Sequence, residues 1–402
     1  MKKRNLEPKK IVIIGGGGAA KEAAVAARKQ DPTCSITILA EESYLPYYRP
    51  FLTEYLSHDI NEKRFYLADD TYYREHHIDI YLNDPVISIL PEGKKVITAS
   101  QNHYAYDQLI LAIGSYNFVP FPQALQKKGV FSIRTYDDAK EVKEYTNKVK
   151  KAIVVGGGLL GLEAAWKLLT KGMEVTVIEL MDRILPLQLD AICSEYFKQI
   201  IEAKGVHLKL GKAVKQILGD ELVSGVELDD GTILPCDLLL FSVGIRPNID
   251  LVKNTGLEIN RGIIVNDKME TSLSAIYAAG DVVEFQGKVN GTWPPALLQG
   301  KVAGTNAAGG SMTYVPPIIS TMLSAFETRI FSIGDLGHIH KESSYKCLSF
   351  KDIKNKVFRQ LYFLESQLVG GILIGDIRYS TKLIKGIANK TSVEKAKDLF
   401  DL

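Results

Sequence analysis

Cysteine, long apolar runs and an excess of one charge are all lacking in this sequence, and each absence excludes a class of protein. The four cysteines of the 402-residue chain lie far apart without a Cys-x-x-Cys pair, which argues against a disulfide scaffold and a four-thiolate metal site. No apolar run approaches the roughly 20 residues of a membrane span, and the run at residues 11–14 is too short for a signal-peptide core. The net charge of +2 gives no field to hold nucleic acid. We expect a soluble, cytoplasmic protein with neither nucleic acid nor a membrane as partner.

Two glycine-rich segments repeat one pattern. The first reads Ile-Val-Ile-Ile-Gly-Gly-Gly-Gly-Ala-Ala over residues 11–20, and the second reads Ala-Ile-Val-Val-Gly-Gly-Gly-Leu-Leu-Gly over residues 152–161. A β-branched strand pattern precedes the glycines in each copy and a helical pattern follows, which is the context that a dinucleotide-binding fingerprint requires. The alternative for a single copy is a tight turn that holds no ligand, but two copies in this context favour nucleotides.

Each position of the fingerprint has a physical reason. The first permits a tight turn, the second lets the backbone approach a pyrophosphate, and the third lets the helix pack close to the strand. The helix N-terminus then offers N–H groups to the phosphates. These positions are Gly15, Gly17 and Ala20 in the first copy, and Gly156, Gly158 and Gly161 in the second.

An acid at the end of the next strand is expected to bind the adenosine ribose. In the second copy this acid is Glu179, which stands 23 residues after Gly156, close to the usual spacing of about 20. The nearest arginine, Arg183, is four residues further on, so NADH is predicted over NADPH. In the first copy the acid is displaced by one residue, which leaves Glu41 as our assignment and Glu42 as a competitor.

The repeat continues beyond the fingerprints, because residues 106–114 resemble residues 236–244: an Asp, an apolar strand and a Gly. Over about residues 9–310 the sequence resembles the two-dinucleotide-binding-domain flavoproteins, the glutathione reductase-like class of FAD-dependent pyridine nucleotide oxidoreductases. The resemblance implies FAD at the first fingerprint and NADH at the second. It also implies further cofactor-binding residues, namely Ala112, Gly114, Gly280, Asp281 and Leu298 for FAD, and Leu160 and Gly244 for NAD.

The branch of the family is suggested by a missing thiol. Disulfide reductases of the class carry a CxxxxC pair in the region of residues 43–56, and this stretch holds no cysteine. Its run Tyr-Leu-Pro-Tyr-Tyr-Arg-Pro at residues 44–50 resembles the NADH:rubredoxin oxidoreductases, and Glu54 stands where the dioxygenase-type ferredoxin reductases have a Lys. The resemblance makes Arg49 a candidate for stabilising the flavin or its phosphates. It makes Glu163 a candidate catalytic residue that faces the nicotinamide.

The predicted fold class is α/β, with two Rossmann-like domains and a small C-terminal α+β domain. We expect an FAD-binding domain at residues 1–116 and 244–312, an NAD-binding domain at 117–243 and the C-terminal domain at 313–402. The predicted activity is electron transfer from NADH through flavin to rubredoxin or a ferredoxin-like iron–sulfur protein. The alternatives are a peroxide-forming NADH oxidase and a subunit of a larger redox complex. His338 and His340 have no third ligand nearby, so no metal site is expected.

Overall fold

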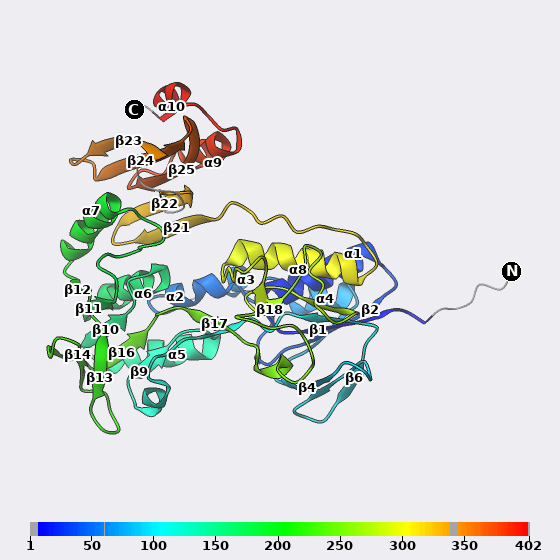
Figure 1. Cartoon of the computed structure of the whole chain (residues 1–402). Helices are drawn as coiled ribbons and strands as arrows, with labels where there is room; N and C mark the ends of the chain where they lie inside the picture. Colours follow the sequence, from blue (N-terminus) through cyan, green and yellow to red (C-terminus); the bar gives the residue numbers. More distant parts are fainter. Residues whose placement is uncertain (1–6, 60, 338–343, 401–402) are drawn as a thin grey trace. The chain divides into compact units, whose positions relative to one another are not determined.

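The chain forms two compact units, each assembled from segments far apart in the sequence. The computed structural model describes residues 7–59, 61–337 and 344–400, so His338 and His340 lie outside the described residues. The first unit comprises residues 1–51, 59–118 and 245–317, and the second comprises residues 52–58, 119–244 and 318–402 (Figure 1). In the described ranges no helix is long and apolar enough to cross a membrane.

A five-stranded parallel sheet forms the centre of the first unit, in the order β19-β7-β1-β2-β3. Its central strands are almost wholly apolar because both faces of a parallel sheet are covered. The strands are β1 (Lys10–Ile14), β2 (Ser35–Leu39), β3 (Ile78–Tyr81), β7 (Gln108–Leu111) and β19 (Ile276–Ala278).

Two helices of the first unit lie side by side, α1 (Gly18–Gln30) and α8 (Trp293–Ala307) (Figure 1). Small residues allow this close approach. A Cβ at Gly300 would lie 2.2 Å from the carbonyl oxygen of Ala19, and one at Gly304 would lie 2.0 Å from that of Ala23. The alanines of α1 therefore pack against glycines that lie 281 residues further along the chain.

Shorter elements complete the first unit. An antiparallel sheet joins β4, β5 and β6, an antiparallel pair joins β8 and β17, and a parallel pair joins β18 and β20. The bounds are η1 (Arg49–Phe51), α3 (Glu62–Phe65), α4 (Asp70–Glu75), β4 (Val86–Leu90), β5 (Lys95–Thr98), β6 (His103–Ala105), β8 (Ser115–Asn117), β17 (Ile245–Pro247), η4 (Asp250–Val252), β18 (Ile263–Ile264) and β20 (Val283–Glu284).

The second unit repeats the parallel sheet in the order β12-β11-β10-β16-β9. This order matches the first sheet strand for strand, although β9 precedes its module in the sequence whereas β19 follows its own. The bounds of this part are α2 (Leu52–Tyr55), η2 (Pro122–Gln126), β9 (Val130–Ser132), α5 (Tyr136–Tyr145), η3 (Thr146–Lys148), β10 (Lys151–Val155), α6 (Leu159–Thr170), β11 (Glu174–Glu179), α7 (Ala191–Glu202), β12 (His207–Leu210), β13 (Val214–Leu218), β14 (Gly225–Leu228), β15 (Ile233–Pro235) and β16 (Leu238–Phe241).

An antiparallel sheet with two helices forms the C-terminal part of the second unit, in the order β21-β22-β25-β24-β23. It shares an apolar core with the α6 and α7 layer, and Asp190, which caps α7, accepts hydrogen bonds from Gln360 and Tyr362 of this sheet. The bounds are β21 (Ser320–Ala325), β22 (Thr328–Gly334), β23 (Tyr345–Asp352), β24 (Val357–Leu364), β25 (Gln367–Ile374), α9 (Ser380–Ala388) and α10 (Val393–Phe400).

The two parallel sheets and the C-terminal α+β part confirm the predicted fold class. The strands expected at residues 106–114 and 236–244 are β7 and β16, which hold the same place in the two sheets. The domain boundaries stay a prediction.

Candidate functional site

The first glycine of each fingerprint is required by the protein itself. Gly15 has φ +124° and Gly156 has φ +116°, a region that L side chains rarely adopt. A Cβ at Gly15 would lie 2.1 Å from the carbonyl oxygen of Ala112, and one at Gly156 would lie 2.2 Å from that of Ser242. Each glycine therefore allows the turn after its strand to pass close to the backbone at the end of the neighbouring strand.

The second glycine of each fingerprint is not required by the protein. Gly17 has φ −97° and Gly158 has φ −80°, which any residue adopts, and a Cβ at either position would meet nothing within 4 Å. Both are the N-cap residues of their helices, α1 and α6, and neither helix end has a side-chain cap. The space at the two helix N-termini is thus open where a pyrophosphate would meet the backbone.

The third position differs between the two copies. Gly161 needs to be glycine, since a Cβ there would lie 2.0 Å from the carbonyl oxygen of Gly156. Ala20 keeps its methyl group and is fully buried in the core of the first unit. Gly161 and Ala20 are therefore both determined by packing.

The strand registers show which residue of the first module corresponds to Glu179. Gly15 N donates to the carbonyl of Leu39, and Gly156 N donates to that of Ile178, each at 2.8 Å. The residue that follows Leu39 is Ala40, so the place of Glu179 is taken by a buried alanine in the first module. The sequence spacing had indicated a displaced acid, and the register explains the displacement.

Glu179 lies against the glycine loop of the second module. Its Oε2 accepts a hydrogen bond of 2.6 Å from Gly157 N, and its Oε1 accepts one of 2.8 Å from Met181 N. The carboxylate is therefore held at the C-terminal edge of β11, beside the open space at Gly158.

Glu41 and Glu42 differ in what surrounds them. Glu41 is exposed. Glu42 accepts hydrogen bonds from the Tyr47 hydroxyl at 2.6 Å and from Arg49 Nη2 at 2.7 Å, and the guanidinium of Arg49 lies over the Tyr47 ring. Burial by itself would lower the pKa of Arg49, but Tyr47, Glu42 and the Asp281 carboxylate raise it above its ordinary value. Arg49 is thus a firmly charged group within the field of Asp281.

The Ala-Gly-Asp turn after β19 is held by residues that the sequence did not single out. Ser115 Oγ donates to Asp281 Oδ2 at 2.9 Å, and Gly280 N donates to the buried Gln299 Oε1 at 2.9 Å. The sequence signal that could have indicated Gln299 is its place directly after Leu298, a predicted FAD residue. Leu298 lies on α8 and packs half-buried against the core. These contacts fix the turn beside the first fingerprint.

Other predicted residues of the first unit surround the same loop. Ala112 is buried at the end of β7, and Gly114 has φ +68° and accepts a hydrogen bond from Asn248 N at 3.0 Å. The Trp293 ring packs edge-on against Tyr48 at 5.1 Å, and a Cβ at Gly18 would strike Trp293. The first unit therefore brings Gly15, Arg49 with its partner Glu42, and the turn that ends at Asp281 to one edge of its sheet.

Glu163 in the second unit lies in a small cluster of charged groups on α2 and α6. Its Oε2 accepts a hydrogen bond of 3.0 Å from Thr53 Oγ1, while Lys167 Nζ lies 2.7 Å from Glu54 Oε2. Burial raises the pKa of the Glu163 carboxyl to about 7, which the Thr53 bond opposes. Glu54 raises this pKa further and Lys167, which is bonded to Glu54, lowers it, so neither charge outweighs the effect of burial.

Two predicted residues of the second module have few contacts. Leu160 is half exposed on the first turn of α6, and a Cβ at Gly244, which has φ +99°, would meet nothing within 4 Å. Both positions are open to a ligand.

Cysteine chemistry is poorly supported by the geometry. All four cysteines lie in the described part of the chain and are free, and three of them are buried. Burial raises the pKa of every one, to about 12 for Cys236. These thiols are therefore protonated at neutral pH. Within the described residues no cluster of His, Cys, Asp or Glu could hold a metal ion.

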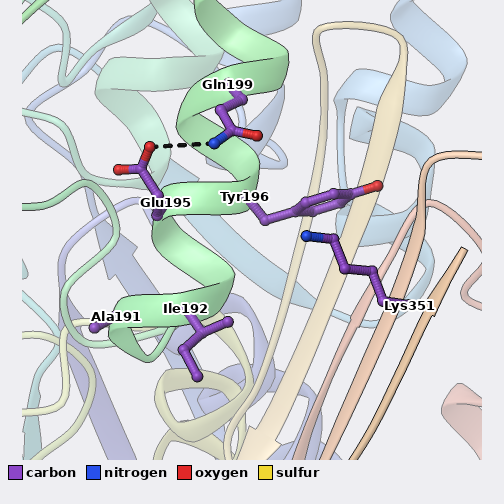
Figure 2. A pocket seen from close by; sticks show the side chains of 6 residues that line it. All are labelled: Ala191, Ile192, Glu195, Tyr196, Gln199 and Lys351. Carbon is purple, nitrogen blue, oxygen red and sulfur yellow. Dashed lines mark hydrogen bonds between the residues drawn. The ribbon is translucent and has the colours of Figure 1, made fainter. Parts of the chain in front are cut away.

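A surface hollow of about 360 Å³ lies along α7 and contains none of the predicted site residues. Figure 2 shows Glu195 bonded to Gln199 along the helix, and the Lys351 ammonium beside the Tyr196 ring, 5.2 Å from its centre. None of the residues that line the hollow belongs to either fingerprint, so the fingerprints remain the candidate site.

The family can be assigned from comparison with known proteins. Residues 9–308 match the pyridine nucleotide-disulphide oxidoreductase family, and residues 320–391 match the rubredoxin NAD+ reductase C-terminal domain. The chain belongs to the pyridine nucleotide-disulphide oxidoreductases. This membership confirms the predicted family and enzyme class, and FAD and NADH follow as the cofactors.

Three relatives illustrate the similarity. A nitrite reductase [NAD(P)H] of Bacillus subtilis is 36% identical over 362 residues, which are 90% of this chain and 44% of that protein. An NADH-rubredoxin oxidoreductase of Clostridium acetobutylicum is 31% identical over 90% of this chain and 91% of that protein. The structure of a ferredoxin reductase for the CYP199A2 system from Rhodopseudomonas palustris has a TM-score of 0.87 at 25% identity, covering 96% and 97% of the two chains. The chain thus spans less than half of the nitrite reductase.

Proposed function

We propose that this chain is an FAD-dependent NADH:acceptor oxidoreductase whose electrons go to rubredoxin or a ferredoxin-like iron–sulfur protein. Bound flavin supplies the chemistry, since it accepts a hydride from NADH and gives up electrons singly. The part of the chain is to bind and orient the two cofactors. We propose residues 1–116 and 244–312 as the FAD-binding domain, 117–243 as the NAD-binding domain and 313–402 as the C-terminal domain.

The FAD site is proposed at the first fingerprint. The open space at Gly17 fits a pyrophosphate, and the helix N-terminus of α1 favours its negative charge. Arg49 would supply a permanent positive charge. Glu41 keeps its assignment to the ribose because Glu42 is already bonded to Tyr47 and Arg49. The proposed FAD residues are Gly15, Gly17, Ala20, Glu41, Arg49, Ala112, Gly114, Gly280, Asp281 and Leu298.

The NADH site is proposed at the second fingerprint. Glu179, fixed by two backbone N–H groups, would accept a hydrogen bond from the ribose 2′-hydroxyl. Glu163 would face the nicotinamide, and its Oε2 holds the hydroxyl proton of Thr53. The proposed NAD residues are Gly156, Gly158, Leu160, Gly161, Glu163, Glu179 and Gly244.

The absence of a thiol relay is the observation that carries the acceptor class. No cysteine lies in residues 43–56, and every thiol of the chain is free with a raised pKa. Electrons would then leave the flavin directly for the acceptor. The NADH-rubredoxin oxidoreductase relative, which matches this chain over 91% of its own length, supports an iron-containing carrier.

Stopped-flow reoxidation tests the acceptor. The enzyme is reduced with NADH and mixed with rubredoxin, ferredoxin or oxygen, and the recovery of the oxidised flavin spectrum is followed. We expect reoxidation by an iron protein to be faster than by oxygen at equal concentration. Faster reoxidation by oxygen would indicate a peroxide-forming NADH oxidase.

A second candidate function is a subunit of a larger redox assembly. The specific observation is that the chain matches less than half of a nitrite reductase, at 36% identity. Co-purification from native cells with an iron–sulfur subunit, and slow reoxidation by all free carriers, would favour this candidate.

A further inference from the structure

Two cations lie close to Glu179 in the second unit, and each is paired with a carboxylate. Lys212 N donates to the backbone carbonyl of Glu179 at 3.1 Å, and the Lys212 ammonium lies 2.7 Å from Asp230 Oδ2. Arg183 Nη1 lies 3.4 Å from Asp182 Oδ1. Lys212 is thus engaged by a carboxylate at the edge where an adenosine ribose would lie, whereas Arg183 Nε is buried without a hydrogen-bond partner among the described residues.

The Asp230 carboxylate is held in place from several sides. It stands in the turn between β14 and β15, where Thr232 N donates to its Oδ1 at 3.0 Å. Asp229 N donates to the carbonyl of Ala213 at 3.0 Å, which ties this turn to the residue after Lys212. The bond to Lys212 and those to Thr232 lower the pKa of Asp230, and the same pairing raises the pKa of Lys212.

A 2′-phosphate, which only NADPH carries, would meet this arrangement. It would bring about two negative charges to the rim formed by Glu179 and its neighbours. Lys212, whose backbone is bonded to that of Glu179, is a cation at this edge that can receive it. Asp230 occupies the ammonium of Lys212 and adds a negative charge of its own.

We propose that Asp230 is a second determinant of NADH specificity, acting by holding Lys212 away from a 2′-phosphate. This inference rests on the proposed NADH site and adds a positioning residue to the carboxylate of Glu179. It requires no contact between Asp230 and NADH.

Nucleotide binding to the FAD-loaded protein tests the proposal without turnover. Calorimetry gives the affinities of adenosine 2′,5′-bisphosphate and of 5′-AMP, and their ratio isolates the 2′-phosphate. We expect Asp230→Asn to raise the relative affinity for the bisphosphate by about fivefold, the scale of one exposed charge. The affinity for 5′-AMP should stay unchanged, and the gain should shrink in high salt.

Two variants serve as controls. Adding Lys212→Met to Asp230→Asn should abolish the gain, because the released ammonium is its source. Glu227→Gln breaks a similar pair on the neighbouring strand, where Lys215 Nζ lies 2.6 Å from Glu227 Oε1, and should leave the ratio unchanged.

Three results would overturn the proposal in distinguishable ways. No change in Asp230→Asn, with 5′-AMP still bound, would refute the role of Asp230 and leave the NADH site intact. An equal gain in relative bisphosphate affinity with and without Lys212 would refute the idea that Asp230 acts by holding Lys212. Failure of the wild type to bind either nucleotide would refute the proposed NADH site itself.

Discussion

Replacing Glu163 with glutamine should stabilise the protein at alkaline pH and change it little at acidic pH. Burial raises the pKa of this carboxyl from its ordinary 4.5 to about 7 in the folded chain. Glutamine has nearly the same shape, can still accept the bond from Thr53, and carries no charge at any pH. The substitution therefore removes the cost of keeping a charge in this place.

The sign and size follow from proton linkage. A carboxyl with a raised folded-state pKa favours the folded state fully below pH 4.5, and this contribution is lost as the pH rises through 7. A shift from 4.5 to about 7 corresponds to about 3 kcal/mol at pH well above 7. The stability gap between Glu163→Gln and wild type should thus widen by about 2 kcal/mol from pH 5 to pH 8.5.

The chain offers a fluorescence probe for this measurement. Trp166 lies on α6 in the second unit, as Glu163 does, and Trp293 is the other tryptophan. In a Trp293→Phe background, urea unfolding followed by tryptophan fluorescence reports the second unit. Infrared difference spectra should also show a protonated carboxyl band that titrates near pH 7 and is missing in Glu163→Gln.

The control is Glu195→Gln on α7, because the Glu195 side chain is 56% exposed and meets water in both folded and unfolded chains. Its effect on the free energy of unfolding should be the same at pH 5 and pH 8.5. A pH-independent gap for Glu163→Gln, or an infrared band that titrates near the ordinary value of 4.5, would refute the reasoning.

Further outcomes follow from the two fingerprints and the thiols. Gly17→Val should give colourless protein lacking FAD, whereas Gly158→Val should stay yellow but resist reduction by NADH; exchanged results would reverse the order of the two sites. Wild type should prefer NADH about tenfold or more in kcat/KM, and Glu179→Ala should narrow this preference through KM; equal use of NADPH by wild type would contradict the assignment. Dithionite titration should consume two electrons per FAD, both in wild type and in a variant with all four cysteines replaced. An uptake of four electrons per FAD by wild type would reveal a redox-active disulfide.

The fingerprints could be predicted from sequence because they are local. A strand, a glycine with positive φ and a helix follow one another within about ten residues. The order of residues around Gly15 and Gly156 is therefore enough to identify the fingerprint. The fold class follows from the repetition of this unit. Glu179 was within reach for the same reason, since only one helix and one strand, α6 and β11, separate it from its glycine loop.

The displaced acid of the first module shows where local reasoning stops. The strand register shows that Ala40 takes the place of Glu179, and the side-chain contacts show that Glu42 is bonded to Arg49. Whether a carboxylate is available for a ribose depends on these partners, which spacing does not give.

The sequence by itself determined the two nucleotide-binding modules and the missing thiol pair, because both are written in short stretches of the chain. Only the tertiary structure decided the environment of the charged groups. Thr53 comes within 3.0 Å of Glu163, 110 residues away, and Gln299 on α8 accepts a hydrogen bond from Gly280 N, 19 residues away. Burial and opposing charges set the pKa and the availability of such groups, and these are properties of contacts between distant segments, which no local pattern of residues encodes.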